Sequence, residues 1–134
     1  MAGSKLDGAG IQKLKTIGEA QATMQTIHGH VERMAIEVKN RNGTGGIPQQ
    51  IKRIAGPLQG QLKGQFGMVA DQVSAMILAL GRGGNDDFRV RTMREHVGQI
   101  RQALEIAATR VEAQHAIADA VPPAGGLAGG PAAR

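Results

Sequence analysis

Apolar residues recur at steps of three and four through three long stretches of this 134-residue chain, and this spacing constrains its fold most strongly. Such steps place side chains on one face of a helix and form the seam along which two helices pack. Glycine-rich segments at 43–46 and 81–84 separate the stretches. We therefore predict an all-α fold, an extended three-helix up-down-up bundle with coiled-coil-like seams crossing at about 20°.

The predicted helices span about 10–40, 48–80 and 86–121, and each presents one apolar seam. Since the chain has only two aromatic residues, the seams must pack through aliphatic and methionine side chains, which suits helix-on-helix contact. Each seam needs a mate, so we expect a homo-oligomer or another helical protein as partner. The helix-packing residues are Ile17, Met24, Ile27, Val31 and Met34, then Leu62, Phe66, Val69, Val73 and Met76, and finally Val97, Ile100, Leu104 and Val111.

The second predicted helix contains residues that weaken helices. Pro57 follows Gly56, and an interior proline removes one helical hydrogen bond, so we expect this helix to be kinked near Pro57, at 55–57. Gly56, Gly60 and Gly64 are spaced by four and share a face. Their spacing favours close approach of another helix, the alternative being a weak segment that opens.

The chain divides into a flexible N-terminus (1–9), a single helical bundle domain (10–121) and a disordered Pro/Gly/Ala tail (122–134). At the start of the third helix, Asp86 or Asp87 is the expected cap. The longest apolar run, 75–80, is too short to span a membrane, and the first ten residues lack the apolar stretch of a signal peptide. With no cysteine in the chain, we expect a cytoplasmic location.

Positive charge is concentrated in one part of the sequence. No acidic residue occurs between Glu37 and Asp71, and the chain as a whole has a formal charge of +5. Such a segment attracts phosphate groups, so a basic nucleic-acid-binding module is the alternative function, against a merely solvated basic face. The candidate residues are Lys39, Arg41, Lys52, Arg53 and Lys63, joined through hairpin folding by Arg82, Arg89, Arg94 and Arg101.

Signatures of cofactor and metal sites are missing from the sequence. The glycine-rich segments are not followed by Lys-Ser or Lys-Thr, so they do not match nucleotide-binding loops. Glu112 and His115 match one Glu-x-x-His element of di-iron bundles, but such bundles need two of these elements and two further glutamates. We therefore predict no metal, no cofactor and no small-molecule ligand.

One short pattern relates to catalysis. Arg91 is followed, after four residues, by His96. This spacing resembles the catalytic pattern of the HEPN ribonuclease superfamily, whose members are helical and dimerise to unite two such pairs. Thr92 stands where that pattern usually has Asn, Asp or His. The resemblance implies a ribonuclease centred on Arg91 and His96 as a lesser alternative.

Three apolar seams and no reactive constellation beyond that pair favour a function without catalysis. We expect a non-catalytic structural or adaptor protein that acts through helix–helix contacts and self-associates.

Overall fold

The computed structural model describes residues 6–82 and 84–116, and this part of the chain is helical without a strand. It contains α1 (Gly8–Lys39), α2 (Ile47–Lys63), α3 (Gly67–Gly81) and α4 (Asp86–Gln114). The predicted all-α class is confirmed. The predicted three-helix bundle is wrong, because the described residues form four helices.

The extra helix arises because the predicted second helix is two antiparallel helices, α2 and α3. The chain reverses at residues 64–66, where Phe66 leaves the helical region with φ −132° and ψ 61°. A break at Pro57, the alternative to a kink there, is excluded because α2 continues through this proline, and the interruption lies at 64–66 instead. Pro57 cannot donate to the carbonyl of Arg53, but both residues are exposed, so water can replace the lost donor.

The reversal at 64–66 follows from local propensity and from burial together. Gly60, Gly64 and Gly67 lower the helical preference of this segment. Phe66 N–H donates to the Leu62 carbonyl at 2.7 Å, and Phe66 is partly buried against the core. The turn therefore directs the seams of α2 and α3 into one common core.

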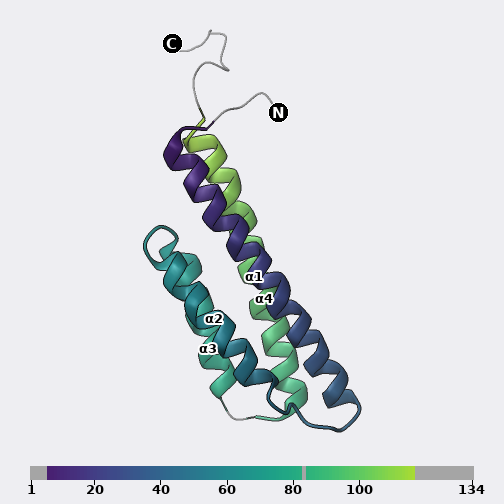
Figure 1. Cartoon of the computed structure of the whole chain (residues 1–134). Helices are drawn as coiled ribbons and strands as arrows, with labels where there is room; N and C mark the ends of the chain where they lie inside the picture. The colour runs from purple at the N-terminus through teal and green to yellow at the C-terminus, as the bar shows by residue number, and fades with distance from the viewer. Residues whose placement is uncertain (1–5, 83, 117–134) are drawn as a thin grey trace.

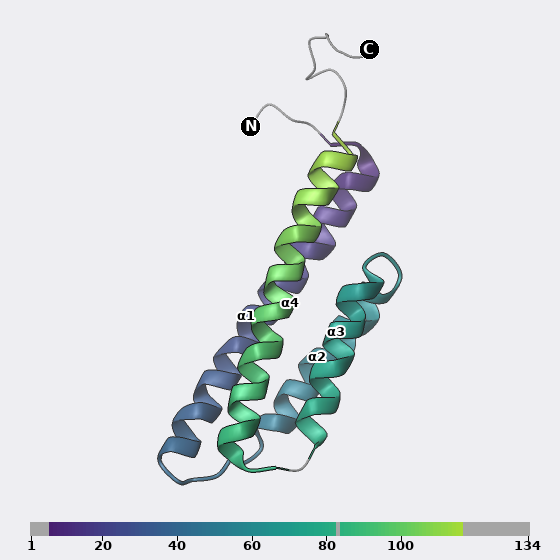
Figure 2. The same cartoon turned by 180° about the vertical axis from the view of Figure 1, so that it is seen from behind.

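The four helices pack in a closed ring, with α1 against α2 and α4, and α3 against α2 and α4. Consecutive helices are antiparallel, as Figures 1 and 2 show from opposite sides. With 32 and 29 residues, α1 and α4 are much longer than α2 and α3, which have 17 and 15. At about 1.5 Å per residue, the long pair extends about 20 Å further than the short pair.

The molecule has three parts, the base, the hairpin and the arm. The base is the end that carries the turns 40–46 and 82–85. The hairpin is α2 with α3, and the arm is residues 8–20 of α1 with 103–114 of α4. Both views show the hairpin ending at the turn 64–66, partway along the long pair, so that the arm extends past it (Figures 1 and 2).

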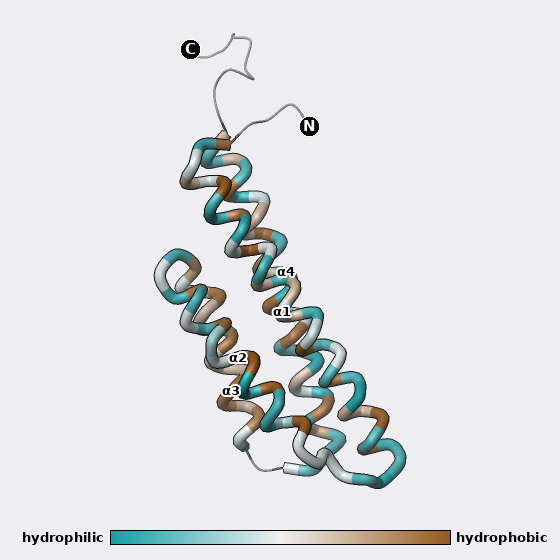
Figure 3. The backbone as a smooth tube through the Cα atoms, in the orientation of Figure 1, coloured by the Kyte–Doolittle hydropathy of each residue, from teal (hydrophilic) through white to brown (hydrophobic). Residues whose placement is uncertain are grey.

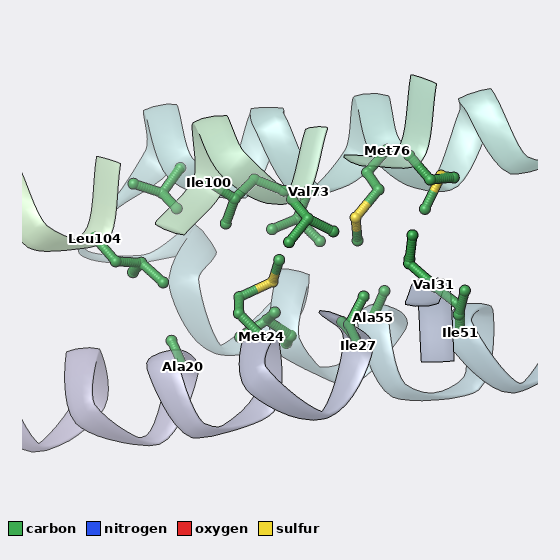
Figure 4. Close-up of a cluster of buried hydrophobic side chains, with 14 of the residues drawn as sticks. Ala20, Met24, Ile27, Val31, Ile51, Ala55, Val73, Met76, Ile100 and Leu104 are labelled. Atoms are coloured by element: carbon green, nitrogen blue, oxygen red, sulfur yellow. The ribbon is translucent and has the colours of Figure 1, made fainter. Parts of the chain in front are cut away.

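The core lies where the seams of all four helices meet. Hydrophobic positions recur along each helix between hydrophilic ones (Figure 3). In Figure 4, Met24 and Ile27 of α1 point towards side chains from the other helices, including Met76 and Ile100. The packing residues expected from the sequence are buried, apart from the partly buried Phe66; they are Ile17, Met24, Ile27, Val31, Met34, Leu62, Val69, Val73, Met76, Val97, Ile100, Leu104 and Val111.

The two ends of the described chain are tied together at the tip of the arm. Asp7 caps α1 by accepting a hydrogen bond from Gly10 N–H at 2.7 Å, and its own N–H donates to the His115 carbonyl at 3.1 Å. The Gly10 hydrogen bond, assisted by the His115 ring 3.1 Å away, holds the pKa of the Asp7 carboxyl below its usual value. Asp7 thus joins the start of α1 to the end of α4.

The helix boundaries differ from the predicted ones at both ends of α4. Asn85 caps this helix by accepting from Phe88 N–H at 2.7 Å, whereas Asp86 and Asp87 lie in its first turn. The helix ends at Gln114, earlier than the predicted residue 121. The predicted disordered tail, 122–134, lies outside the described residues.

The glycine stripe of α2 does not receive another helix. A Cβ atom added at Gly56, Gly60 or Gly64 would meet no described atom within 4 Å. The prediction of close packing at these positions is therefore wrong for this chain taken alone, and the stripe faces solvent.

Gly60→Ala should stabilise the protein. The added methyl group has open space, and alanine in a helix interior is favoured over glycine by about 0.5–1 kcal/mol. Urea unfolding followed by circular dichroism measures the change.

Gly10→Ala is the matched control, because its Cβ would lie 2.5 Å from the His115 Cβ and must displace the end of α4. We expect this variant to lose stability. A Gly60→Ala protein that unfolds at lower urea than the parent would contradict the open-space assignment.

Candidate functional site

An open groove lies where the turned end of the hairpin meets the arm. It has a volume of about 480 Å³ and runs between the start of α3 and the second half of α4, with α1 at one edge. Its apolar lining consists of Phe66, Met68, Val69, Ala103, Ile106, Ala107 and Val111. Met68 and Ile106 are 80% and 47% exposed, so this lining offers apolar area that the fold itself leaves uncovered.

The polar rim of the groove is positive or neutral. Its charged members are Lys13 of α1 and Arg110 of α4, and no acidic residue is among the described residues that line it. Gln65, Gln72 and Gln114 supply the neutral polar groups. The Oε1 atom of Gln72 is buried and has no hydrogen-bond partner within the described chain. The groove can therefore accept an apolar surface that also brings hydrogen-bond donors or negative charge.

The sequence pattern did not reveal this groove, because its exposed members stand off the seams. Met68 and Ile106 belong to no seam, and off-seam apolar residues are common on protein surfaces. Only the reversal at 64–66 places α3 opposite the second half of α4 and so brings Met68 and Ile106 to one groove.

The base gathers part of the predicted basic group. Lys39 ends α1, Arg41 follows in the turn, and Arg82 follows α3. Lys52 of α2 joins them, since its Nζ would lie 3.7 Å from a Cβ added at Gly81. Arg89 of α4 donates to the Arg82 carbonyl at 3.4 Å. Basic side chains of α1, α2 and α4, and those of Arg41 and Arg82 in the connections, therefore lie at the base.

Arg41 has an unusual backbone conformation. With φ 62° it occupies the left-handed region, where glycine is usual at the end of a helix. Its N–H donates to the Val38 carbonyl at 3.0 Å, and Asn42 N–H donates to the Glu37 carbonyl at 2.9 Å. These bonds form the Schellman motif, and a non-glycine residue in this position costs about 1–2 kcal/mol.

Other members of the predicted basic group lie elsewhere. Lys63 stands at the opposite end of α2 from the base, next to the turn at 64–66, and Arg53 is exposed partway along the same helix. Arg101 faces α1 at a shallow surface lined by Gln21 and Gln25. The nine residues therefore do not form one patch.

Arg94 is engaged within the molecule. Its guanidinium donates to both carboxylate oxygens of Glu32, at 2.8 and 2.9 Å, and joins α4 to α1. This hydrogen bonding lowers the pKa of Glu32 and raises the pKa of Arg94. Because both side chains are about half exposed, the pair contributes little stability.

Arg91 and His96 lie on different sides of α4. Arg91 is exposed and faces α1 in a shallow groove shared with Ile36 and Lys39. His96 is partly buried, and burial lowers its pKa, with the charge of Arg82 at the end of α3 acting in the same direction. The described chain therefore does not bring the two side chains to one site.

The Glu-x-x-His element has a structural role at its histidine. His115 contacts Asp7 and Lys13, with 3.1 Å between His115 Nε2 and Lys13 Nζ, whereas Glu112 is exposed. Within residues 6–82 and 84–116, no three His, Asp or Glu side chains gather as metal ligands would.

No protein-family model, no curated protein and no solved structure matches this chain. None of the helices in the described ranges combines the length and hydropathy needed to cross a bilayer. The groove and the group of basic residues at the base of the molecule are therefore the two features from which a function can be argued.

The Glu32–Arg94 pair predicts the direction of one titration. In the parent protein the pKa of the Glu32 carboxyl lies below its ordinary value, so the stabilisation from this pair is present above that value and is lost as the pH falls through the lowered pKa. Arg94→Gln should move the Glu32 pKa up, towards its ordinary value. Carboxyl-detected NMR of both proteins measures the change, and an unchanged Glu32 pKa would contradict the contact.

Proposed function

We propose that this protein is a non-catalytic adaptor that acts through helix–helix contacts, and that its groove receives a helix of another protein or of a second copy. The observation that supports it is the uncovered apolar lining at Met68 and Ile106, which lie on α3 and α4 at one open groove. A groove between helices is the usual receptor for the apolar face of an amphipathic helix.

In this fold the groove, and not the helix seams, is the surface that needs a partner. The seams of all four helices mate inside the molecule, so they do not themselves require an oligomer. Ile11, Ile36, Leu78 and Phe88 are exposed as well, but none of them lines the groove, and singly exposed apolar residues are ordinary on protein surfaces. Only at the groove do exposed apolar residues from two helices face a common open space.

Methyl NMR of methionine tests the proposal directly. Met68 is 80% exposed, whereas Met24, Met34, Met76 and Met93 are fully buried and serve as internal references. A synthetic helical peptide with a leucine face and glutamine flanks should shift the Met68 methyl resonance saturably and leave the four core methyls in place.

Ile106→Ser should weaken this binding by about fivefold or more, because it removes apolar contact at the centre of the groove. Leu78→Ser is the matched control, since Leu78 is 64% exposed on α3 away from the groove. A Met68 resonance that stays fixed at millimolar peptide, or equal losses in both variants, would refute groove docking.

A second candidate, a nucleic-acid-binding module, is favoured by Arg41. Glycine would fit the left-handed position without strain, yet the chain carries a cation there, in the turn after α1. Strained positions concentrate where side chains have a function. One aromatic side chain, the exposed Phe88 in the first turn of α4, is described at this end, so contact would be mainly with backbone phosphates. The Arg91–His96 pair has no comparable support for a ribonuclease, given its separation across α4.

Arg41→Gly separates the effect of Arg41 on stability from its effect on nucleic-acid binding. The variant should gain about 1 kcal/mol of stability from the relieved backbone, and it should lower the salt dependence of nucleic-acid binding by about one phosphate contact. Fluorescence anisotropy with labelled duplex DNA across a salt series measures the slope.

Lys63→Gln is the matched control, because it removes a positive charge at the far end of α2. Its slope should equal that of the parent. The nucleic-acid candidate fails if the parent protein shows no binding at low salt, or if both variants change the slope alike.

The location we propose is cytoplasmic, which the cysteine-free composition supports because nothing in the chain depends on an oxidising compartment.

A further inference from the structure

We propose that the groove is specific for a helix of a different protein whose apolar face is flanked by acidic side chains. This inference rests on the proposed adaptor function and names the chemistry of the partner. It is carried by the charges around the groove, which are of one sign.

The two cations at the rim are not engaged in ion pairs within the described residues. Neither Lys13 nor Arg110 forms an ion pair with a carboxylate of the described chain. The Nζ atom of Lys13 contacts the His115 ring, which Asp7 contacts on its other nitrogen. The charge of Lys13 contributes to lowering the pKa of the Asp7 carboxyl, so it is partly compensated. Acidic flanks on an incoming helix would still meet two cations that form no ion pair with a described carboxylate.

The same charges oppose a second copy in this position. Two copies that meet groove to groove would bring together two Lys13 and two Arg110 side chains, with no described lining carboxylate between them. Like charges placed across an interface are unfavourable and act against the wrong partner. A foreign helix with glutamate or aspartate flanks meets no such opposition.

The apolar lining suits a helix rather than an extended segment. Ala103 and Ala107 are one turn apart on α4 and flank Ile106, so large partner side chains can sit over the alanines and beside the isoleucine. Met68, on the opposite wall, has an unbranched side chain that can adapt to the partner's shape. These contacts repeat at helical spacing, as in helix-in-groove recognition.

Three synthetic peptides with one leucine face test the preference, with glutamate, glutamine or lysine flanks respectively. Binding of each to the full-length protein is followed at the Met68 methyl resonance. We expect the glutamate peptide to bind about tenfold more tightly than the glutamine peptide and the lysine peptide to bind most weakly, with the differences shrinking as salt is added.

Charge reversal at the rim should reverse the order of the peptides. Lys13→Glu combined with Arg110→Glu should favour the lysine peptide. Lys15→Glu combined with Arg101→Glu is the matched control, because it makes the same change in net charge on exposed positions of α1 and α4 outside the groove, and it should keep the parent order. Lys13→Gln with Arg110→Gln, a milder pair, should remove most of the preference and serves if the reversed variant does not fold.

The outcomes separate this inference from the proposed function. Equal binding of all three peptides at Met68, abolished by Ile106→Ser, would overturn the acidic preference and leave helix docking intact. A Met68 resonance that no peptide moves would overturn both. A Met68 shift on concentrating the protein alone, together with a doubled mass in sedimentation, would show that a second copy occupies the groove and would also overturn the inference.

Discussion

The mating of four apolar helix faces in one ring is the interaction on which the rest of this structure depends. Each face is a stripe of aliphatic or methionine side chains, and burying one such side chain contributes about 1.5–3 kcal/mol. Every stripe contacts stripes on two neighbouring helices. Because these contacts satisfy the seams internally, the remaining surface is free to be shaped by helix length and by turns.

The groove exists because the four helices differ in length. The short hairpin covers only part of the long pair, and the described ends of that pair are fixed by the contact of Asp7 with His115. At the hairpin turn, the start of α3 and the second half of α4 leave the groove between them. The apolar lining and the two rim cations without an ion pair in the described residues are thus consequences of where α2 ends and α3 begins.

Two local features reduce stability without a packing gain in the isolated chain. The glycine stripe of α2 faces solvent, and Arg41 holds a left-handed backbone conformation. The stripe aids the reversal at 64–66 by weakening the helix there, while Arg41 places a cation at the base. The structure gives no packing reason for Gly56, which stands in the interior of α2.

The sequence by itself determined that the chain is helical, where its turns at 43–46 and 81–84 fall, and which side chains lie in the core. Spacing alone decides these, because a helix repeats every 3.6 residues whatever it packs against. It did not determine the reversal at 64–66, since the steps through Leu62, Phe66 and Val69 stay at four and three and match a continuous helix equally well. Only the tertiary structure decided that α2 and α3 fold back on each other, because the gain from burying both seams in one core belongs to contacts between segments far apart in the chain. The groove forms only because the chain reverses at 64–66, which is why no sequence pattern predicts a site at Met68 and Ile106.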